Sequence, residues 1–331
     1  MASMTPPRIR SVTGRRSRPD PSDLPVQRCR FTAMGTQVEL LAVDPPRDAL
    51  ADGRARLAEL EQRWSRFRPD SETSALNHAR GRPVAVSPET FTLVALAVVG
   101  WQVSGGRFDP TVLDTLERAG YDRSFEQLGA GAAVPQIGWP MPAPGLDGVV
   151  LDHQAGTVTL PAGRRFDPGG IAKGYAADLL CAQLLADGAA GACVNLGGDL
   201  RVRGVSPHGS PWIVAVPFPL GGTATTFELP DGAVATSSPL RRAWGPAERP
   251  LHHLIDPRTG QPADTGILQV TVVADEAWWA EILAKAAYLA GLPDALEVVA
   301  GLGAHALAVD QDGHLQATAG LRPTSPAPGT R

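Results

Sequence analysis

Strand-like and helical segments alternate along the chain with no linker between them, and this alternation limits the folds that the chain can adopt. Residues 29–43 ("CRFTAMGTQVELLAV") and 268–274 ("LQVTVVA") are rich in apolar and β-branched residues, which favour strands. Residues 46–67, 87–104 and 171–186 have the apolar spacing or the capping residues of helices. The pattern has no regular repeat. It predicts an α+β fold, a single compact unit with mixed sheets packed by helices.

Composition places the chain among globular proteins and argues against one class of partner. The chain has 331 residues, of which 43% are hydrophobic and 19% charged, enough for one large or two ordinary domains. Its formal net charge is -4, whereas binding to a phosphate backbone usually needs a concentrated basic face. We therefore expect no nucleic-acid partner.

The two ends of the chain differ from the rest. Residues 1–27 are rich in Arg, Pro and Ser, and residues 319–331 are similarly poor in apolar side chains, so we predict two disordered tails around a folded domain at 28–318. The longest apolar run, residues 91–103, is too short to cross a bilayer. No membrane anchor is visible, and we expect a cytoplasmic protein.

The sharpest motif is "FDPGGIAKGYAADLL", residues 166–180. Asp167 and the pair Gly169 and Gly170 stand where a strand gives way to a helix, so backbone N–H groups and the positive end of the helix dipole face one cleft. Lys173 follows one turn later. The combination suits a phosphate-bearing ligand, although a capped helix with a surface lysine explains the motif equally well when it is taken alone.

Two further motifs combine glycines with ionisable residues. In "NLGGDLRV" (195–202) a glycine pair interrupts a strand, which indicates either a plain bulge or a ligand that approaches the backbone closely. In "HHLIDPRTGQP" (252–262) the turn residues need no function, but His253 lies near apolar residues and has the chemistry of a proton carrier near neutral pH. A structural histidine is the alternative.

Seven motifs occur in an order that resembles one known family. These are "MGT" (34–36), "WSRFRPDSETSALN" (64–77), "GRFDPTV" (106–112), "DPGGIAKGYAAD" (167–178), "NLGGDL" (195–200), "ATSSPLRR" (235–242) and "HHLIDPRTG" (252–260). Together they are similar to the FAD:protein FMN transferases of the ApbE type over roughly residues 30–310.

The resemblance implies an enzyme that splits the pyrophosphate of FAD, attaches FMN to a Ser or Thr hydroxyl of an acceptor flavoprotein and releases AMP, usually with magnesium. It also implies contacts to FAD, which carry over to Met34, Phe67, Phe108, Asp109, Asp167, Lys173 and His253. The backbone carbonyl of Gly170 falls where the family holds its metal, and His253 falls near the pyrophosphate, where it would help to deprotonate the acceptor hydroxyl.

The chain departs from the family pattern in the stretch "AEILAK", residues 280–285. The resemblance implies Asp and Thr as metal ligands one helical turn apart, but this chain has Glu281 and Lys285. A protonated lysine cannot ligate a metal, which leaves the magnesium requirement open. Either the two residues form an ordinary i,i+4 ion pair on an exposed helix face, or the Lys285 ammonium is held by Glu281 in the place of the metal and acts in catalysis.

Two alternative functions share the same pocket. An FAD pyrophosphatase would give FMN and AMP with water as the attacking group. A non-catalytic FAD-binding protein with a degenerate metal site would keep FAD intact. Release of AMP, with and without an acceptor, distinguishes the three.

Overall fold

An eight-stranded sheet forms the centre of the computed structural model, which describes residues 23–128, 141–209, 211–221, 225–245 and 251–321. The strand order is β1-β2-β6-β7-β10-β15-β16-β17, and every neighbouring pair is antiparallel. The strands are β1 (Val26–Ala33), β2 (Thr36–Val43), β6 (Gly191–Leu196), β7 (Asp199–Gly204), β10 (Gly232–Ser237), β15 (Ile267–Ala274), β16 (His305–Asp310) and β17 (Leu315–Ala317).

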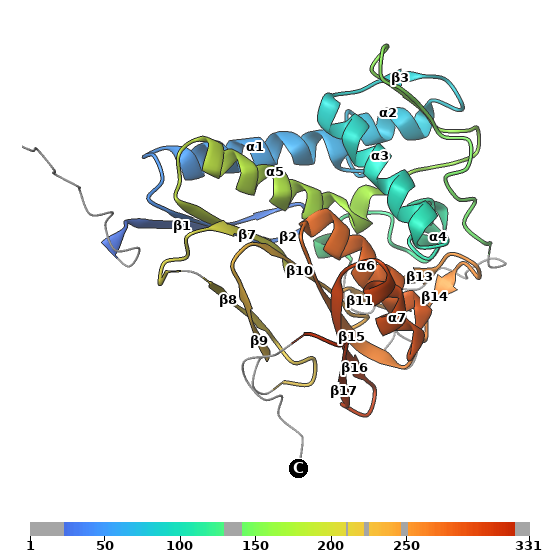
Figure 1. Cartoon of the computed structure of the whole chain (residues 1–331). Coiled ribbons are helices and arrows are strands. Elements are labelled where there is room, and N and C mark those ends of the chain that lie inside the picture. The colour runs from blue at the N-terminus through green and yellow to red at the C-terminus, as the bar shows by residue number, and fades with distance from the viewer. Residues whose placement is uncertain (1–22, 129–140, 210, 222–224, 246–250, 322–331) are drawn as a thin grey trace, which may run out of the picture.

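Helices cover one face of this sheet (Figure 1). They are α1 (Ala49–Trp64), α5 (Ala172–Ala186), α6 (Ala277–Ala290) and α7 (Asp294–Gly301). On β2, the alternate residues Val38, Leu40 and Ala42 face this layer and share the main core with Leu57 of α1 and Leu180 of α5. The apolar residues on alternate positions of the strand and on one face of each helix thus pack together in one continuous apolar layer.

A hairpin covers part of the opposite face of the sheet. Leu41 and Val43 of β2 point away from the helices and pack in a second cluster with Trp212 and Phe227. These two aromatic residues belong to a separate antiparallel pair, which consists of β8 (Trp212–Val216) and β9 (Thr225–Leu229). The strand β2 is therefore buried on both faces.

A smaller region stacks on the helical layer (Figure 1). Gly100 allows its helix α3 to approach α6, because a Cβ atom there would overlap the side chain of Ile282. The region contains α2 (Glu72–His78), α3 (Pro88–Val103), α4 (Leu113–Arg118) and a three-stranded sheet of β3 (Val84–Ala85), β5 (Thr157–Thr159) and β4 (Val150–Asp152). Short strands complete the fold: β11 (Ala243–Trp244), β12 (Leu251–His252), β13 (Ile255–Asp256) and β14 (Gln261–Pro262).

The predicted α+β class is confirmed, with two local differences. Mixed pairing was predicted, but all pairings between the named strands are antiparallel, because hairpins and β–α connections return each strand beside its neighbour in the opposite direction. Gly197 and Gly198 are not a bulge: both have positive φ and form the turn between β6 and β7. Residues 1–22 and 322–331 of the predicted tails lie outside the described residues, and β1 begins at Val26.

Membrane-spanning helices are absent from the part of the chain that the structure describes, because none of its helices is both long and apolar enough to cross a bilayer.

Candidate active site

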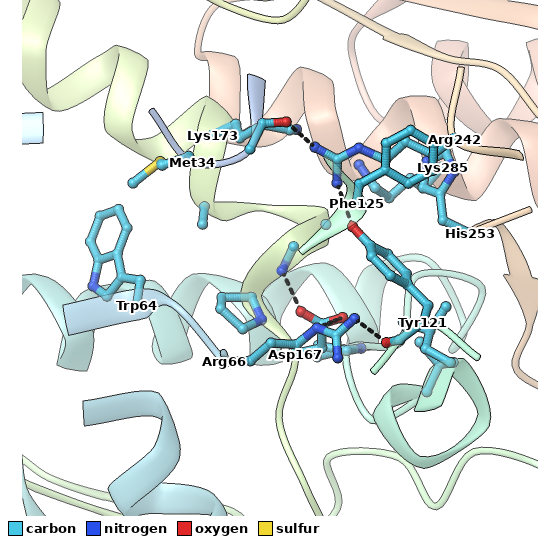
Figure 2. Close-up of a pocket in the computed structure, with 18 of the residues that line it drawn as sticks. Met34, Trp64, Arg66, Tyr121, Phe125, Asp167, Lys173, Arg242, His253 and Lys285 are labelled. Atoms are coloured by element: carbon cyan, nitrogen blue, oxygen red, sulfur yellow. Dashed lines mark hydrogen bonds and ion pairs between the residues drawn. The ribbon is translucent and has the colours of Figure 1, made fainter. Parts of the chain in front are cut away.

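A cavity of about 440 Å³ lies between the helical layer and the smaller region. Segments that are far apart in the sequence contribute to its wall, including the β1–β2 turn at Met34, the loop after α1 and the start of α5. Figure 2 shows Arg242, Lys285 and His253 gathered at one end, with Met34 and Trp64 toward the other. The cavity thus combines a cationic end with an apolar end.

The motif at residues 166–180 builds one wall of the cavity. Asp167 caps a short 3-10 helix, Pro168–Gly170, by accepting a hydrogen bond of 2.9 Å from the Gly169 N–H group. The same carboxylate lies 3.5 Å from Nε of Arg66, a side chain that is only 6% exposed. Asp167 therefore ties the loop after α1 to the turn before α5 (Figure 2).

Arg66 is held in one orientation by an aromatic clamp. Its guanidinium lies over the ring of Phe67 at 4.2 Å and over the ring of Tyr121 at 4.7 Å. It also donates a hydrogen bond of 2.7 Å to the backbone oxygen of Tyr121. These contacts hold Tyr121 in the cavity wall between Arg66 and Arg242, as Figure 2 shows.

Lys173, the second residue of α5, is not a surface lysine. Its Nζ atom lies 2.6 Å from Oε1 of Glu281 and also pairs with the carboxylate of Asp199. Oε2 of Glu281 accepts a hydrogen bond of 2.8 Å from the N–H group of Gly174. Burial alone would raise the pKa of Glu281, but Lys173 and Lys285 outweigh it and lower that pKa to about 2. Glu281 is therefore a buried anion at neutral pH.

Lys285 is the second cation on this carboxylate. Its Nζ atom lies 3.1 Å from Oε1 of Glu281, which is 1% exposed. The pair is thus inside the protein, which excludes the alternative of an ordinary ion pair on an exposed helix face. Burial lowers the pKa of Lys285 more than the attraction of Glu281 raises it. Lys285 also lines the cavity.

His253 follows β12 and lines the same end of the cavity. Burial, and then the positive charges of Arg242 and Lys285, hold the pKa of His253 well below its ordinary value. Its Nδ1 atom is buried and has no hydrogen-bond partner among the described residues. The side chain is therefore a neutral imidazole in a cationic environment, a form that can accept a proton.

Three of the remaining predicted residues line the cavity at other points. Phe108 is 3% exposed and packs in the main core, whereas Phe67 is 39% exposed at the rim. Oδ1 of Asp109 accepts hydrogen bonds from the backbone and the hydroxyl of Thr111, at 2.8 and 2.6 Å, and burial raises the pKa of Asp109. Asp109 thus stabilises the turn that joins it to Thr111.

The structure brings the predicted site residues together. Those that line the one cavity are Met34, Phe67, Phe108, Asp109, Asp167, Gly170, Lys173, His253 and Lys285. Glu281 lies behind this wall and holds both lysines. At the β1–β2 turn, Met34 has a positive φ, and its N–H group donates a hydrogen bond of 2.9 Å to Glu61.

Sequence reasoning missed Arg242. This residue ends the motif "ATSSPLRR", and it donates hydrogen bonds of 3.3 Å to the hydroxyl of Tyr121 and to the backbone oxygen of Gly35. The motif itself was a signal, because two adjacent arginines can form an anion site. Asp199 belongs to the motif at 195–202, but no role was predicted for it, and Tyr121 gave no comparable local signal.

Comparison with known proteins identifies the family. A sequence model described as the ApbE family matches residues 34–308. The chain belongs to the ApbE family. The matched region of this ApbE family member includes every predicted site residue, from Met34 to Lys285.

Curated relatives carry the name FAD:protein FMN transferase. One from Rhodobacter capsulatus is 31% identical over 304 residues, covering 88% of this chain and 57% of that protein. One from Treponema pallidum is 30% identical over 305 residues, covering 82% of this chain and 80% of that protein. The chain thus spans a little over half the length of the Rhodobacter relative.

Solved structures of the ApbE family share the fold. The ApbE protein from Thermotoga maritima is 28% identical, with a TM-score of 0.79, over 89% of this chain and 97% of that one. The apo form of the flavinyl transferase ApbE from Pseudomonas stutzeri is 25% identical, with a TM-score of 0.75, over 89% of this chain and 95% of that one.

Proposed function

We propose that this protein is an FAD:protein FMN transferase, which transfers FMN from FAD to a Ser or Thr hydroxyl of an acceptor flavoprotein and releases AMP. One observation carries the proposal: the cationic end of the cavity, with Lys173, Arg242 and Lys285, also contains the neutral imidazole of His253. A pyrophosphate needs cations, and an attacking hydroxyl needs a proton acceptor. Membership of the ApbE family and the names of the curated relatives support this proposal.

The transfer of FMN can be written as one displacement at phosphorus in which every bond and proton is accounted for. The acceptor oxygen attacks the phosphorus atom of the FMN half, a new P–O bond forms, and the P–O bond to the AMP phosphate breaks. The hydroxyl proton goes to His253, and AMP leaves with the bridging oxygen. Displacement at phosphorus depends mostly on positioning and on neutralisation of the oxygens that gain charge. The ammonium and guanidinium groups at this end of the cavity supply that neutralisation.

The apolar end suits the ring systems of FAD. Met34 and Trp64 line the cavity away from Arg242, Lys285 and His253. Phe108 lines it beside Gly170 and Lys285, and Phe67 lies at its rim. Flat aromatic ligands gain most of their affinity by contact with such side chains. We assign Met34, Phe67, Phe108, Asp109 and Asp167 to this binding function.

The test is covalent flavin on an acceptor protein. The protein is incubated with FAD and a purified acceptor domain that bears a Ser/Thr flavinylation motif, and the denatured acceptor is examined by in-gel fluorescence. We expect a fluorescent acceptor and released AMP. AMP and free FMN without a labelled acceptor would instead indicate a pyrophosphatase, and intact FAD would indicate a binding protein.

Adjacent histidines provide a matched pair of variants. His253→Gln should lower transfer about 100-fold or more, since general-base catalysis contributes about 10²- to 10⁴-fold. His252→Gln changes a residue that does not line the cavity and whose Nδ1 atom accepts a hydrogen bond of 3.3 Å from the N–H group of Leu254, and it should have little effect on transfer. Equal losses in the two variants would contradict the assigned role of His253.

A further inference from the structure

Lysine is almost absent from this protein, and its two occurrences are both in the cavity. The chain has 30 Lys and Arg residues in total, and the printed sequence contains only Lys173 and Lys285 among them. Both line the cavity and both bind Oε1 of Glu281. All other residues in this count are arginines. The two positions with a compact ammonium group therefore call for a local explanation.

The oxygen atoms next to these lysines do not fit a divalent cation. Mg²⁺ prefers several free oxygen ligands, mainly carboxylates and water. Here Oε1 of Glu281 binds two ammonium groups and Oε2 accepts the Gly174 N–H group. The carboxylate of Asp199 pairs with Lys173. A metal would have to displace an ammonium group that is already held in place, and it would lie beside a like charge.

The stem of Lys285 also fills the space beside Gly170. A Cβ atom at Gly170 would lie 3.2 Å from Cε of Lys285 and 2.9 Å from Cε2 of Phe108, so only glycine leaves room for this side chain. Lys285 therefore lies between Gly170 and Glu281, the two groups that the family resemblance assigns to a metal. The ammonium group of Lys285 thus supplies a positive charge at the position where the family resemblance implies a metal ion.

We propose that the Lys285 ammonium group acts as a built-in cation that contacts the pyrophosphate of FAD, so that this protein binds and cleaves FAD without a resident divalent metal. The inference rests on the proposed function for its substrate. Lys285 is held by Glu281, and Arg242 lies near the same end of the cavity (Figure 2). An ammonium group fixed before the substrate arrives needs little reorganisation during the reaction.

The first test measures FAD affinity, which does not depend on transfer. Quenching of flavin fluorescence gives the Kd for FAD in excess EDTA and in MgCl₂. We expect the two values to agree within about threefold for the unmodified protein. Lys285→Met should weaken binding about 10- to 100-fold in both buffers, as expected for loss of a hydrogen bond from a charged group. Arg28→Met, which removes an exposed cation paired with Glu39, should leave the Kd unchanged.

The second test needs no variant. Protein labelled with ¹³C at lysine Cε gives signals from only two side chains, because the chain has only two lysines. We expect FAD to shift these signals, and we expect stoichiometric Mn²⁺ to broaden neither of them. Broadening of a lysine signal by Mn²⁺, or FAD binding that is lost in EDTA, would overturn the proposal. Absence of transfer to any acceptor, with these binding results intact, would refute the proposed function alone.

Discussion

Lys285 Nζ lies 3.1 Å from Oε1 of Glu281 in the interior of the protein, and the same oxygen is 2.6 Å from the ammonium group of Lys173. One carboxylate therefore holds two cations at one end of a cavity. Removing one member of a buried ion pair is costly because it leaves an uncompensated charge. The stability of the protein and the charge of its site consequently depend on the same residues.

Acid should weaken the fold through Glu281. The pKa of Glu281 is about 2 in the folded protein, below its ordinary value of 4.5. The unfolded chain therefore binds more protons between these values, so the contribution of Glu281 to stability is complete above pH 4.5 and is lost as the pH falls toward 2. Urea unfolding at a series of pH values measures this loss.

The variant Glu281→Gln isolates the effect. At pH 7 it should lower the free energy of unfolding by about 3 to 5 kcal/mol, since two ammonium groups lose their shared anion. Its stability should also decline less steeply with acid than that of the unmodified protein. Glu39→Gln, which breaks pairs with the exposed Arg28 and Arg30, is the control and should cost less than about 1 kcal/mol. Equal effects of the two changes would contradict the buried network.

Gly174→Ala should damage the fold and the site together. A Cβ atom at position 174 would overlap the backbone oxygen of Ala277, where α5 and α6 cross, and Gly174 also donates its N–H group to Glu281. We expect a loss of a few kcal/mol, in the range of other severe overpacking changes. Gly301→Ala is the matched control, because no atom lies near a Cβ there, and thermal unfolding of both variants provides the comparison.

The transfer rate should not fall at the pH where an ordinary histidine gains its proton. Burial and the charges of Arg242 and Lys285 hold the pKa of His253 well below 6.5, so the imidazole stays neutral as the pH falls through that value. Lys285→Met should raise the pKa of His253 by removing one of these charges. An NMR titration of the ring carbons measures both pKa values, and an unchanged His253 pKa in the variant would contradict the shared environment.

Local patterns were sufficient to predict much of the fold. A helix was predicted over residues 87–104, and Ser87 caps it by accepting a hydrogen bond from the N–H group of Thr90 at the start of α3. Capping and periodicity involve neighbours in the sequence, so they can be read without the fold. The turn at Gly197 was misread, because a glycine pair between apolar segments suits a bulge and a hairpin turn equally well before the strand register is known.

The site was predictable only as separate parts. Asp167, Lys173 and His253 were found through motifs, but the pairing of Lys173 with Glu281 joins residues that are 108 positions apart. The contacts of Arg242 with Tyr121 and Gly35 depend in the same way on how loops from distant segments meet. An i,i+4 spacing could not show whether Glu281 and Lys285 face solvent or the interior. That distinction required the packing of α6 against α5.

The most direct measurement of the central claim is the stoichiometry between released AMP and flavin on the acceptor. The protein is incubated with FAD and an acceptor domain, AMP is quantified by chromatography, and the intact mass of the acceptor shows whether FMN is attached through a phosphoester. We predict one AMP released for each FMN attached, in EDTA as in magnesium. AMP release without a mass change on the acceptor, or no AMP release in either buffer, would contradict transfer of FMN by this protein.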